Sequence, residues 1–286
     1  MNFRISLTGD LGSGKSTVGK ILSEKYEAKI YSTGPIVRQI AADKGISVVE
    51  LNKLMESDPK IDHEMDDRLK LLSEEPGNLI IDSRMAWFFT KGTFRVYLAT
   101  SIEESAKRIF NDEKRTSETF ASVEEAVNKI RERKTSENLR YKTLYNADCS
   151  FMGNYDLVVD TTASPAELAA ELIGNSYKKF IDGEEAAKIF MYGGRLIPTV
   201  EITEEDIKTA IETKDEPICK PINITVCNGE MFITNKEDAV KALRCVAVGN
   251  NLIPCSAEYT DLAPAVSDET KENWKQTVNE IKPKKK

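Results

Sequence analysis

The segment that most constrains the fold lies near the start, where a short apolar run leads into Gly9-Asp10-Leu11-Gly12-Ser13-Gly14-Lys15-Ser16-Thr17. The spacing is that of the G-x-x-x-x-G-K-[ST] phosphate-binding loop. The run before it predicts a buried strand, and Val18, Ile21 and Leu22 recur at helical spacing after it. A strand, a loop and a helix therefore follow one another in the order that this loop requires.

The loop predicts a nucleoside triphosphate as ligand. In such a loop the successive N–H groups and the helix N-terminus converge on the β- and γ-phosphates. Lys15 would add a positive charge, and the Ser16 hydroxyl would reach Mg²⁺. We therefore expect ATP with Mg²⁺ to be bound by these residues: Gly9, Gly12, Ser13, Gly14, Lys15, Ser16 and Thr17.

Composition is that of a globular protein. The chain has 286 residues, 40% hydrophobic and 30% charged, which is enough for two domains of common size. Its net charge of −7 argues against nucleic acid as a partner. No apolar run reaches membrane-spanning length, and no signal-peptide pattern precedes the first strand. We expect a cytoplasmic protein without membrane contact.

The cysteines and the histidine exclude two classes of site. The five cysteines are scattered and form no C-x-x-C pair, which predicts reduced thiols and no zinc site. His63 is the only histidine, so a Ser-His-Asp hydrolase or a histidine-based metal site would have to be built on it alone. The single histidine therefore argues against both kinds of site.

Beyond the loop the pattern alternates between strands and helices. Strands are predicted at 29–31, 79–81, 94–98 and 157–160, with helical spacing between them. A helix start is predicted at Asp58 as cap, with Pro59 in the first helical position. Strands separated by helices indicate a parallel sheet covered on both faces. We predict an α/β fold, a P-loop kinase fold with a five-stranded parallel sheet flanked by helices, over residues 1–174.

The segment after the second strand favours a phosphate as the acceptor of the phosphoryl group. A kinase that phosphorylates an alcohol would benefit from a nearby carboxylate, yet no acid follows Tyr31 until Asp43. An anionic phosphate oxygen needs no base and instead needs positive charge to bring two polyanions together. Ser32, Thr33 and Gly34, with Arg38 one turn later, would supply such a cradle.

At this point the chain resembles a known family. Ser-Thr-Gly-x-x-x-Arg is similar to the acceptor motif of nucleoside monophosphate kinases, and the chain is most similar to cytidylate kinases of the short archaeal type. Three further segments carry the likeness, namely 57–62 with Asp66 and Arg68, then 81–87, then 131–141. The resemblance extends over about residues 1–173 and implies transfer of a phosphoryl group from ATP to CMP or dCMP.

The resemblance implies roles for particular residues. Those implied to bind the acceptor nucleotide are Ser32, Gly34, Arg38, Asp62, Arg84, Arg133, Glu137 and Arg140. Lys15, Arg108 and Arg133 are implied to act on the transferred group, with Arg108 and Arg115 in the lid segment. Ser16 and Asp82 are implied to hold Mg²⁺.

Several alternatives stay open. Asp82 could instead orient Arg84, and Asp62 could be a first-turn acid stabilised by the helix dipole. Arg133, Glu137 and Arg140 share a helix face, which is also the pattern of an exposed ion-pair network. An adenylate kinase-like or other small-molecule P-loop kinase is the alternative activity. A regulatory protein that senses nucleotides is the alternative outside enzymes.

The remaining residues, 175–286, predict a small α+β domain with a regulatory or interaction role and its own partner or ligand. We expect a helix within 176–190, a strand at 196–200 and a helix at 204–211 capped by Thr203. A hairpin turning at Asn228-Gly229, a helix at 236–246 and a strand at 252–254 follow. The domain faintly resembles ParB-like nuclease and sulfiredoxin-type domains. Asn235-Lys236-Glu237-Asp238 stands in place of their phosphate-binding Gly-x-x-Arg.

Overall fold

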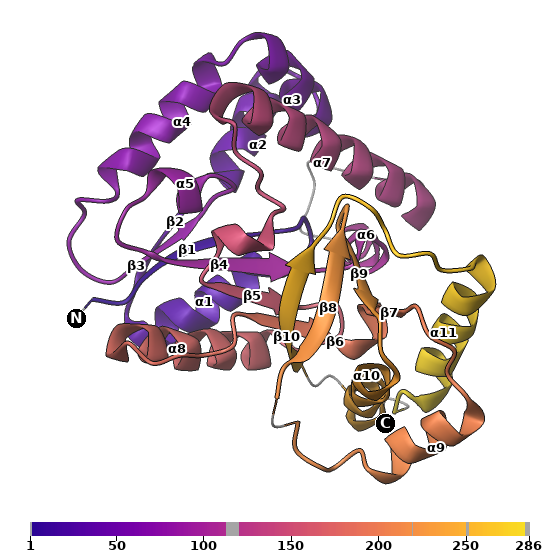
Figure 1. Ribbon diagram of the computed structural model, residues 1–286. Helices are drawn as coiled ribbons and strands as arrows, with labels where there is room; N and C mark the ends of the chain where they lie inside the picture. Colours follow the sequence, from indigo (N-terminus) through magenta and orange to yellow (C-terminus); the bar gives the residue numbers. More distant parts are fainter. Residues whose placement is uncertain (1, 113–119, 219, 250–251, 284–286) are drawn as a thin grey trace. The chain divides into compact units, whose positions relative to one another are not determined.

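The structure is a computed structural model that describes residues 2–112, 120–218, 220–249 and 252–283 (Figure 1). The chain divides into two compact units. The first contains residues 1–156 and 166–182, and the second contains residues 157–165 and 183–286. We expected a single boundary near residue 174. The division differs from it because the strand predicted at 157–160 belongs to the second unit.

The first unit contains a parallel sheet whose strands are ordered β2-β3-β1-β4. Residues such as Ile5, Leu7 and Ile80 are completely buried, because helices cover both faces of the sheet. This explains why the strands read as continuous apolar runs. The strands are β1 (Arg4–Gly9), β2 (Lys29–Ser32), β3 (Leu79–Asp82) and β4 (Phe94–Ala99).

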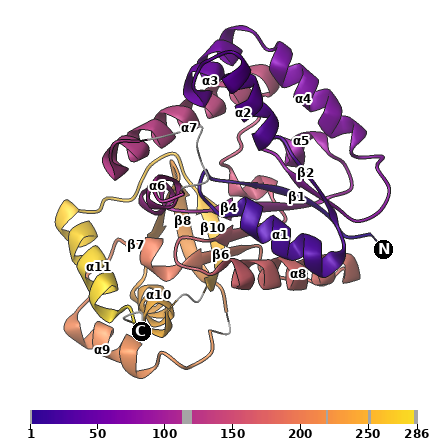
Figure 2. The same ribbon diagram turned by 180° about the vertical axis from the view of Figure 1, so that it is seen from behind.

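Helices surround this sheet. α1 (Lys15–Tyr26) and α8 (Ala166–Asp182) pack side by side, as the view from behind shows (Figure 2). α3 packs against α2, α4 and α7, and α6 packs against α7. The other helices of the unit are α2 (Gly34–Asp43), α3 (Val48–Ser57), α4 (Lys60–Leu71), α5 (Ala86–Phe89), α6 (Ile102–Phe110), α7 (Val123–Tyr145) and the 3₁₀ helix η1 (Met152–Asn154).

The start of α4 differs by one residue from the prediction. Pro59, not Asp58, is the residue that precedes the helix, and α4 begins at Lys60. Asp58 still caps this end, because its Oδ1 accepts a hydrogen bond from the Lys60 N–H at 3.2 Å. The local signal for a helix start was therefore correct, and only its position moved.

The second unit has a mixed sheet with the strand order β5-β6-β10-β8-β9-β7. The pairs β5/β6, β10/β8 and β9/β7 are parallel, whereas β6/β10 and β8/β9 are antiparallel. The strands are β5 (Leu157–Asp160), β6 (Ile189–Tyr192), β7 (Ile197–Pro198), β8 (Ile222–Cys227), β9 (Glu230–Ile233) and β10 (Leu252–Tyr259).

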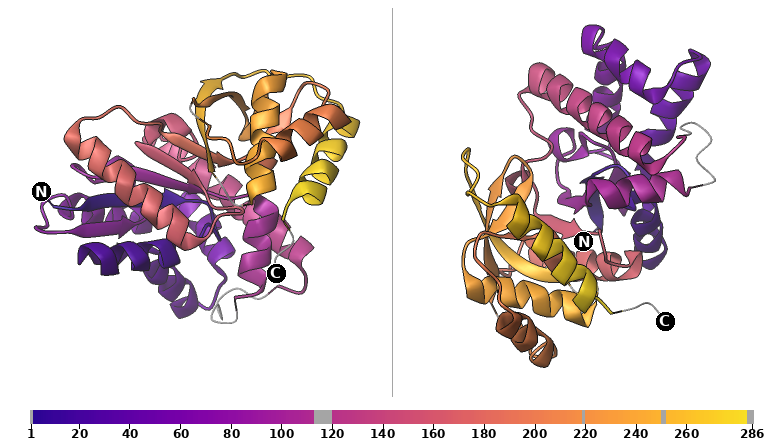
Figure 3. Two further views of the ribbon diagram at one scale, coloured as in Figure 1. Left: turned by 90° about the horizontal axis from the view of Figure 1, so that it is seen from below. Right: turned by 90° about the vertical axis from the view of Figure 1, so that its right-hand side faces the viewer.

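The helices of the second unit are α9 (Glu204–Glu212), α10 (Lys236–Val248) and α11 (Asp268–Ile281), with the 3₁₀ helix η2 (Gly193–Arg195). α10 packs on strands β6, β8, β9 and β10, and on α9 and α11 (Figure 3). The expected cap and hairpin are confirmed. Thr203 accepts a hydrogen bond from the Asp206 N–H, and Asn228 and Gly229 take left-handed conformations between β8 and β9.

Other predictions for residues 175–286 were correct only in part. The helix expected within 176–190 is the end of α8, which stops at Asp182, because Gly183 takes a left-handed φ of 71° and β6 begins at Ile189. The strand expected at 196–200 is reduced to two residues, and the last strand extends to Tyr259. α11 was not expected, since Trp274 and Val278 are its only buried residues.

Two observations bear on the class of protein. Within the described ranges, no helix is both long and apolar enough to cross a membrane. The four described cysteines, Cys149, Cys227, Cys245 and Cys255, are buried free thiols, and Cys219 lies outside the described residues.

Candidate functional site

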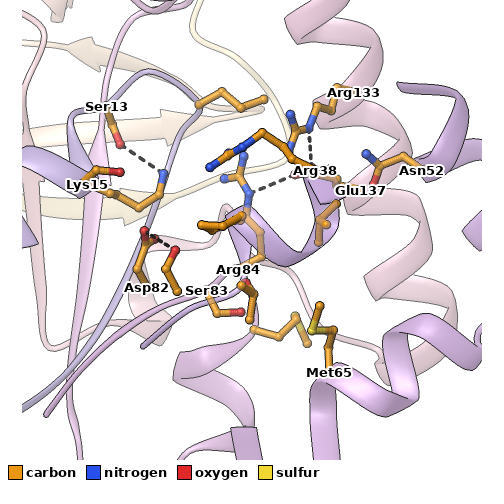
Figure 4. A pocket seen from close by; sticks show the side chains of 18 of the residues that line it. Ser13, Lys15, Arg38, Asn52, Met65, Asp82, Ser83, Arg84, Arg133 and Glu137 are labelled. Atoms are coloured by element: carbon orange, nitrogen blue, oxygen red, sulfur yellow. Dashed lines mark hydrogen bonds and ion pairs between the residues drawn. The ribbon is translucent and has the colours of Figure 1, made fainter. Parts of the chain in front are cut away.

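A cavity of about 560 Å³ in the first unit contains most of the residues predicted to be functional. It is bounded by the loop after β1, the ends of β2 and β3, and helices α2, α3, α4, α6 and α7. The carboxyl ends of parallel strands are where open α/β sheets bind ligands. Figure 4 shows the central side chains of this cavity from close by.

The phosphate-binding loop forms one wall of this cavity. Gly14 has a left-handed φ of 81° and immediately precedes α1, a conformation that side chains rarely adopt. At Gly9 a side chain would collide with the backbone of Leu98 on β4, so glycine is required there by close packing. Gly12, Ser13, Ser16 and Thr17 line the cavity, as expected.

Lys15 is the buried cation of this wall. Its Nζ donates hydrogen bonds to the carbonyl oxygens of Gly9 at 3.0 Å and Asp10 at 2.8 Å. Burial, together with the nearby positive charge of Arg84, lowers the pKa of Lys15 to about 8. The ammonium group therefore remains mostly protonated at neutral pH and can pair with phosphate oxygens.

Asp82 and Ser16 line the same cavity and supply the hard oxygen ligands that Mg²⁺ prefers. Asp82 Oδ2 accepts a hydrogen bond from the Ser32 hydroxyl at 3.0 Å, which ties the end of β3 to the end of β2. These residues fit a magnesium ion bound with a nucleotide. Among the described residues, Asp82 forms no hydrogen bond or ion pair with Arg84, so no contact supports its alternative role of orienting Arg84.

Arg38 faces the cavity from α2, one turn after Gly34. Its guanidinium lies close to Gly34, where an added Cβ would be 3.4 Å from Nη1. In the part of the chain that the structure describes, Arg38 has no hydrogen bond or ion pair with a protein group. Its five N–H donors are therefore available to an anionic ligand.

Arg84 and Arg133 meet at one buried carboxylate. Glu137 on α7 pairs with Arg84 Nε at 3.0 Å and with Arg133 Nε at 2.8 Å (Figure 4). Arg84 also donates a hydrogen bond to the carbonyl oxygen of Gly9 in the phosphate-binding loop. Burial alone would raise the pKa of Glu137, but the two guanidinium groups outweigh it and lower that pKa to about 2. The network has an excess of positive charge beside the loop.

Arg140 has a different partner from the one that its helix spacing suggested. It pairs with Asp62 on α4, Nε to Oδ2, at 3.0 Å, and donates a hydrogen bond to Asn52 Oδ1 on α3 at 2.7 Å. The Arg140 and Asp62 side chains are only 3% and 6% exposed. The alternative of a solvated ion-pair face on α7 is wrong for these residues, because the network is buried and lines the cavity.

Asp62 and Asp66 place two carboxylates at this end of the cavity. Burial raises the pKa of Asp62 to about 6, although Arg140 opposes the shift. Burial also raises the pKa of Asp66, against a hydrogen bond that Asp66 accepts from the Tyr145 hydroxyl. With Asn52, this end of the cavity offers hydrogen-bond donors and acceptors of the kind that a polar base edge requires.

Arg108 approaches the loop from α6. It pairs with Glu104 at 2.9 Å and donates a hydrogen bond to the Gly12 carbonyl oxygen at 3.2 Å. It therefore lies next to the loop, as its predicted role requires. Arg115, the other arginine of the lid segment, lies outside the described residues.

Sequence reasoning missed Asn52, Met65 and Asp66 as cavity residues. A signal for Asn52 was present, because it occupies a buried position at helical spacing with Val48, Leu51 and Met55. An amide within such an apolar face indicates a buried polar partner. Asp66 lies one turn after Asp62, and only the fold shows that both face inward.

The second unit offers no comparable anion site at the start of α10. Asn235 Oδ1 accepts a hydrogen bond from the Asp238 N–H at 2.9 Å, and Asp238 Oδ2 accepts one from the Asn223 N–H at 3.0 Å. This helix N-terminus is thus satisfied by its own side chains and carries a negative charge.

The fold and the loop place the first unit among P-loop proteins. The model of a family described as cytidylate kinase-like matches residues 4–163. The chain therefore belongs to the cytidylate kinase-like family, which confirms the resemblance drawn from its motifs.

Two archaeal relatives support membership of this family. The cytidylate kinase of Methanocella arvoryzae is 35% identical over 169 residues, which are 59% of this chain and 93% of that protein. The cytidylate kinase of Methanobrevibacter smithii is 33% identical over 174 residues, 61% of this chain and 98% of that protein. Among solved structures, a shikimate kinase from Bacteroides thetaiotaomicron is 13% identical with a TM-score of 0.43, covering 62% of this chain and 99% of that one.

Proposed function

We propose that the first unit transfers the γ-phosphoryl group of Mg·ATP to a nucleoside monophosphate, most readily CMP or dCMP. The observation that carries the proposal is a single cavity that joins a phosphate-binding loop to a second set of cations and then to a polar pocket. A protein that only senses ATP would not need the second and third parts. Membership of the cytidylate kinase-like family supports the same proposal.

The donor binds at the loop in this proposal. The N–H groups of the loop, the N-terminus of α1 and Lys15 hold the β- and γ-phosphates. Ser16 and Asp82 would hold the magnesium ion, which neutralises charge on the phosphates when it is bound. Arg108 and Arg133 lie beside this position and stabilise the charge of the transferring group.

The acceptor binds in the second and third parts of the cavity. Arg38 and Arg84 hold its phosphate, and Ser32 and Gly34 line the approach. The base lies against Asp62, Asn52 and Arg140. A cytosine edge presents an amino group, which suits a carboxylate, and ring acceptors, which suit a guanidinium.

The chemistry requires no general base from the protein. The acceptor oxygen of a monophosphate is already anionic at neutral pH, so the protein must bring two polyanions together and neutralise them. The cations around Glu137 perform this task, since burial keeps water from weakening their effect on the phosphates.

A coupled assay of ADP formation on the full chain with Mg·ATP tests the proposal, with CMP, dCMP, UMP and AMP as separate acceptors. We expect kcat/KM for CMP or dCMP to exceed that for AMP by about tenfold or more, because an unpaired hydrogen-bonding group in the site costs ~1–3 kcal/mol. Chromatography of the products must show the matching diphosphate. AMP as the best acceptor would support the adenylate kinase-like alternative.

Lys15→Ala is the negative control and should abolish turnover, since it removes the buried cation of the loop. Lys20→Ala is its matched control, because Lys20 is on the same helix but exposed and, among the described residues, paired with Glu24. ATP binding without phosphoryl transfer to any monophosphate would instead support the nucleotide-sensing alternative.

A further inference from the structure

Asp10 is an acidic residue within the phosphate-binding loop that the proposed chemistry leaves unused. It is only 9% exposed, yet it does not line the cavity. A carboxylate in a loop that must hold several negatively charged phosphates opposes their binding, and a buried charge is costly unless it is paired. The groups that contact the Asp10 carboxylate therefore decide how strongly its negative charge opposes phosphate binding.

The partners of the Asp10 carboxylate include groups on β4, directly after β4 and on α7. The Tyr97 hydroxyl on β4 donates a hydrogen bond to Oδ1 at 2.9 Å, and the Thr100 N–H donates one to Oδ2 at 3.1 Å. The Lys134 ammonium on α7 donates a hydrogen bond to Oδ1 at 2.8 Å. Lys134 brings a positive charge into direct contact with the carboxylate, and the charges of Lys15 and Arg84 also act on Asp10.

Lys134 also joins the loop to α7, the helix that carries Arg133 and Arg140. It directly follows Arg133 and lies one turn before Glu137, and α7 continues to Arg140. Its contact with Asp10 therefore fixes α7 at the same loop to which Arg84 and Arg108 donate hydrogen bonds.

We propose that Lys134 is a positioning residue for the triphosphate. Its ion pair with Asp10 neutralises the carboxylate of the loop and holds α7 where Arg133 meets the phosphates that Lys15 binds. The inference rests on the proposed function only in that ATP is the ligand of the loop. It is independent of which monophosphate accepts the phosphoryl group.

The competing interpretation is an ion pair of no consequence. The Lys134 side chain is 44% exposed, and exposed ion pairs contribute little to stability. The Asp10 side chain, by contrast, is 11% exposed. Loss of Lys134 would therefore leave a mostly buried carboxylate beside the triphosphate, and ATP affinity distinguishes the two interpretations better than stability does.

The test measures binding of Mg·ATP to the full chain by titration calorimetry, without an acceptor. Lys134→Met should weaken ATP binding by about tenfold or more, and Lys134→Arg should remain within about threefold of the original protein. The double variant Asp10→Asn with Lys134→Met should regain most of the lost affinity, because it no longer has a carboxylate to neutralise. Thermal unfolding of each variant accompanies the titrations.

Lys129→Met is the matched control. Lys129 is on the same helix, its side chain is 45% exposed, and it pairs with Glu132. ATP affinity should not change in this variant. If Lys134→Met behaves like Lys129→Met, or if the double variant binds ATP as weakly as Lys134→Met, the inference is wrong.

Two further outcomes remain interpretable. If Lys134→Met does not fold, Asp10→Asn is compared with the double variant. The inference predicts that these two proteins bind ATP with equal affinity. Weaker ATP binding by the double variant than by Asp10→Asn would contradict it. If the unmodified protein does not bind Mg·ATP, the proposed function itself fails.

Discussion

Arg38 and Arg84 are the two arginines assigned to the acceptor phosphate, and their surroundings differ. Arg84 is bound by Glu137 and by the Gly9 carbonyl oxygen, and its side chain is 20% exposed. Arg38 has no recorded protein partner among the described residues. One guanidinium is thus held in place before ligand binds, whereas the other is available to move onto the ligand.

This difference predicts distinct effects of two substitutions. Arg38→Ala should raise the KM for the acceptor, with a loss of about 2–4 kcal/mol of transition-state binding and little change in melting temperature. Arg84→Ala should cause a similar kinetic loss and also lower stability by about 3 kcal/mol or more, because Glu137 loses one of its two cations. Steady-state kinetics and chemical denaturation measure the two effects.

Arg68→Ala serves as the control, because Arg68 is exposed on α4 and pairs with Glu64, its neighbour on the same helix. An increase in the KM for ATP, with the acceptor KM unchanged, would show that the two binding sites have been assigned in the wrong order.

For single residues, the sequence predicted which side chains line the site better than it predicted which side chains contact one another. Lys15, Arg84, Arg133 and Glu137 were expected in one site, and they do line one cavity. Helix spacing correctly placed Glu137 beside Arg133. It could not show that Arg84, from another element, is the second partner of Glu137, because such a contact depends on tertiary packing.

At the scale of elements, the junction of α4 with α7 is a part of the site that responds to pH. The Asp62–Arg140 ion pair and the hydrogen bond from Tyr145 to Asp66 both join these helices. The folded protein favours the protonated form of Asp62, whose pKa is raised to about 6. The contribution of Asp62 to stability is therefore greatest below its ordinary pKa range and decreases as pH rises through about 6.

The same pKa shift of Asp62 predicts a step in the pH dependence of kcat/KM for the acceptor. As pH falls through about 6, Asp62 is protonated and can no longer accept hydrogen bonds with a full charge, so kcat/KM for CMP should decrease. Asp62→Asn should lower kcat/KM by about tenfold at pH 8 and remove this step. The phosphate of CMP also titrates near pH 6, but it does so equally with both proteins.

Asp67→Asn is the matched control, since Asp67 is exposed on the same helix and pairs with Lys70. It should keep the pH profile of the unmodified protein. Identical profiles for the Asp62 variant and the unmodified protein would remove Asp62 from the acceptor site.

Elements with strong local signals were predicted well, and those defined by tertiary pairing were not. The phosphate-binding loop, the hairpin at Asn228-Gly229 and the cap at Thr203 combine periodicity with a turn or capping residue. β7 has only two residues, and it forms by pairing with β9. α11 buries only Trp274 and Val278, so its sequence resembles that of a solvated segment.

At the scale of the whole molecule, the end of α8 marks where the first unit ends along the chain. This helix belongs to the first unit and ends at Asp182, beyond the family match that ends at residue 163. Tyr177 and Phe180 on α8 both form ring contacts with Phe94 on β4. The second half of α8 therefore covers Phe94, a buried residue of the first unit.

A truncated chain tests whether residues beyond α8 are needed for the chemistry. We predict that residues 1–182 retain ATP-dependent phosphorylation of the monophosphate, although β5 lacks its partner β6 in this fragment. A fragment that ends at Ile173 should be less stable, because it also lacks Tyr177 and Phe180. Solubility, melting temperature and ADP formation are compared with those of the full chain. A soluble and folded but inactive 1–182 fragment would place a required residue in the second unit.

The pairing of β5 with β6 has a consequence while the chain is being synthesised. Leu157, Val158 and Val159 are completely buried in the finished protein, and Val158 and Val159 pair with β6, which follows α8 in the chain. A growing chain therefore exposes one edge of this apolar strand before β6 exists, and an exposed strand edge can pair with other chains. During translation the protein passes through an interval in which association with a chaperone would be most useful, and that interval ends only when β6 has left the ribosome.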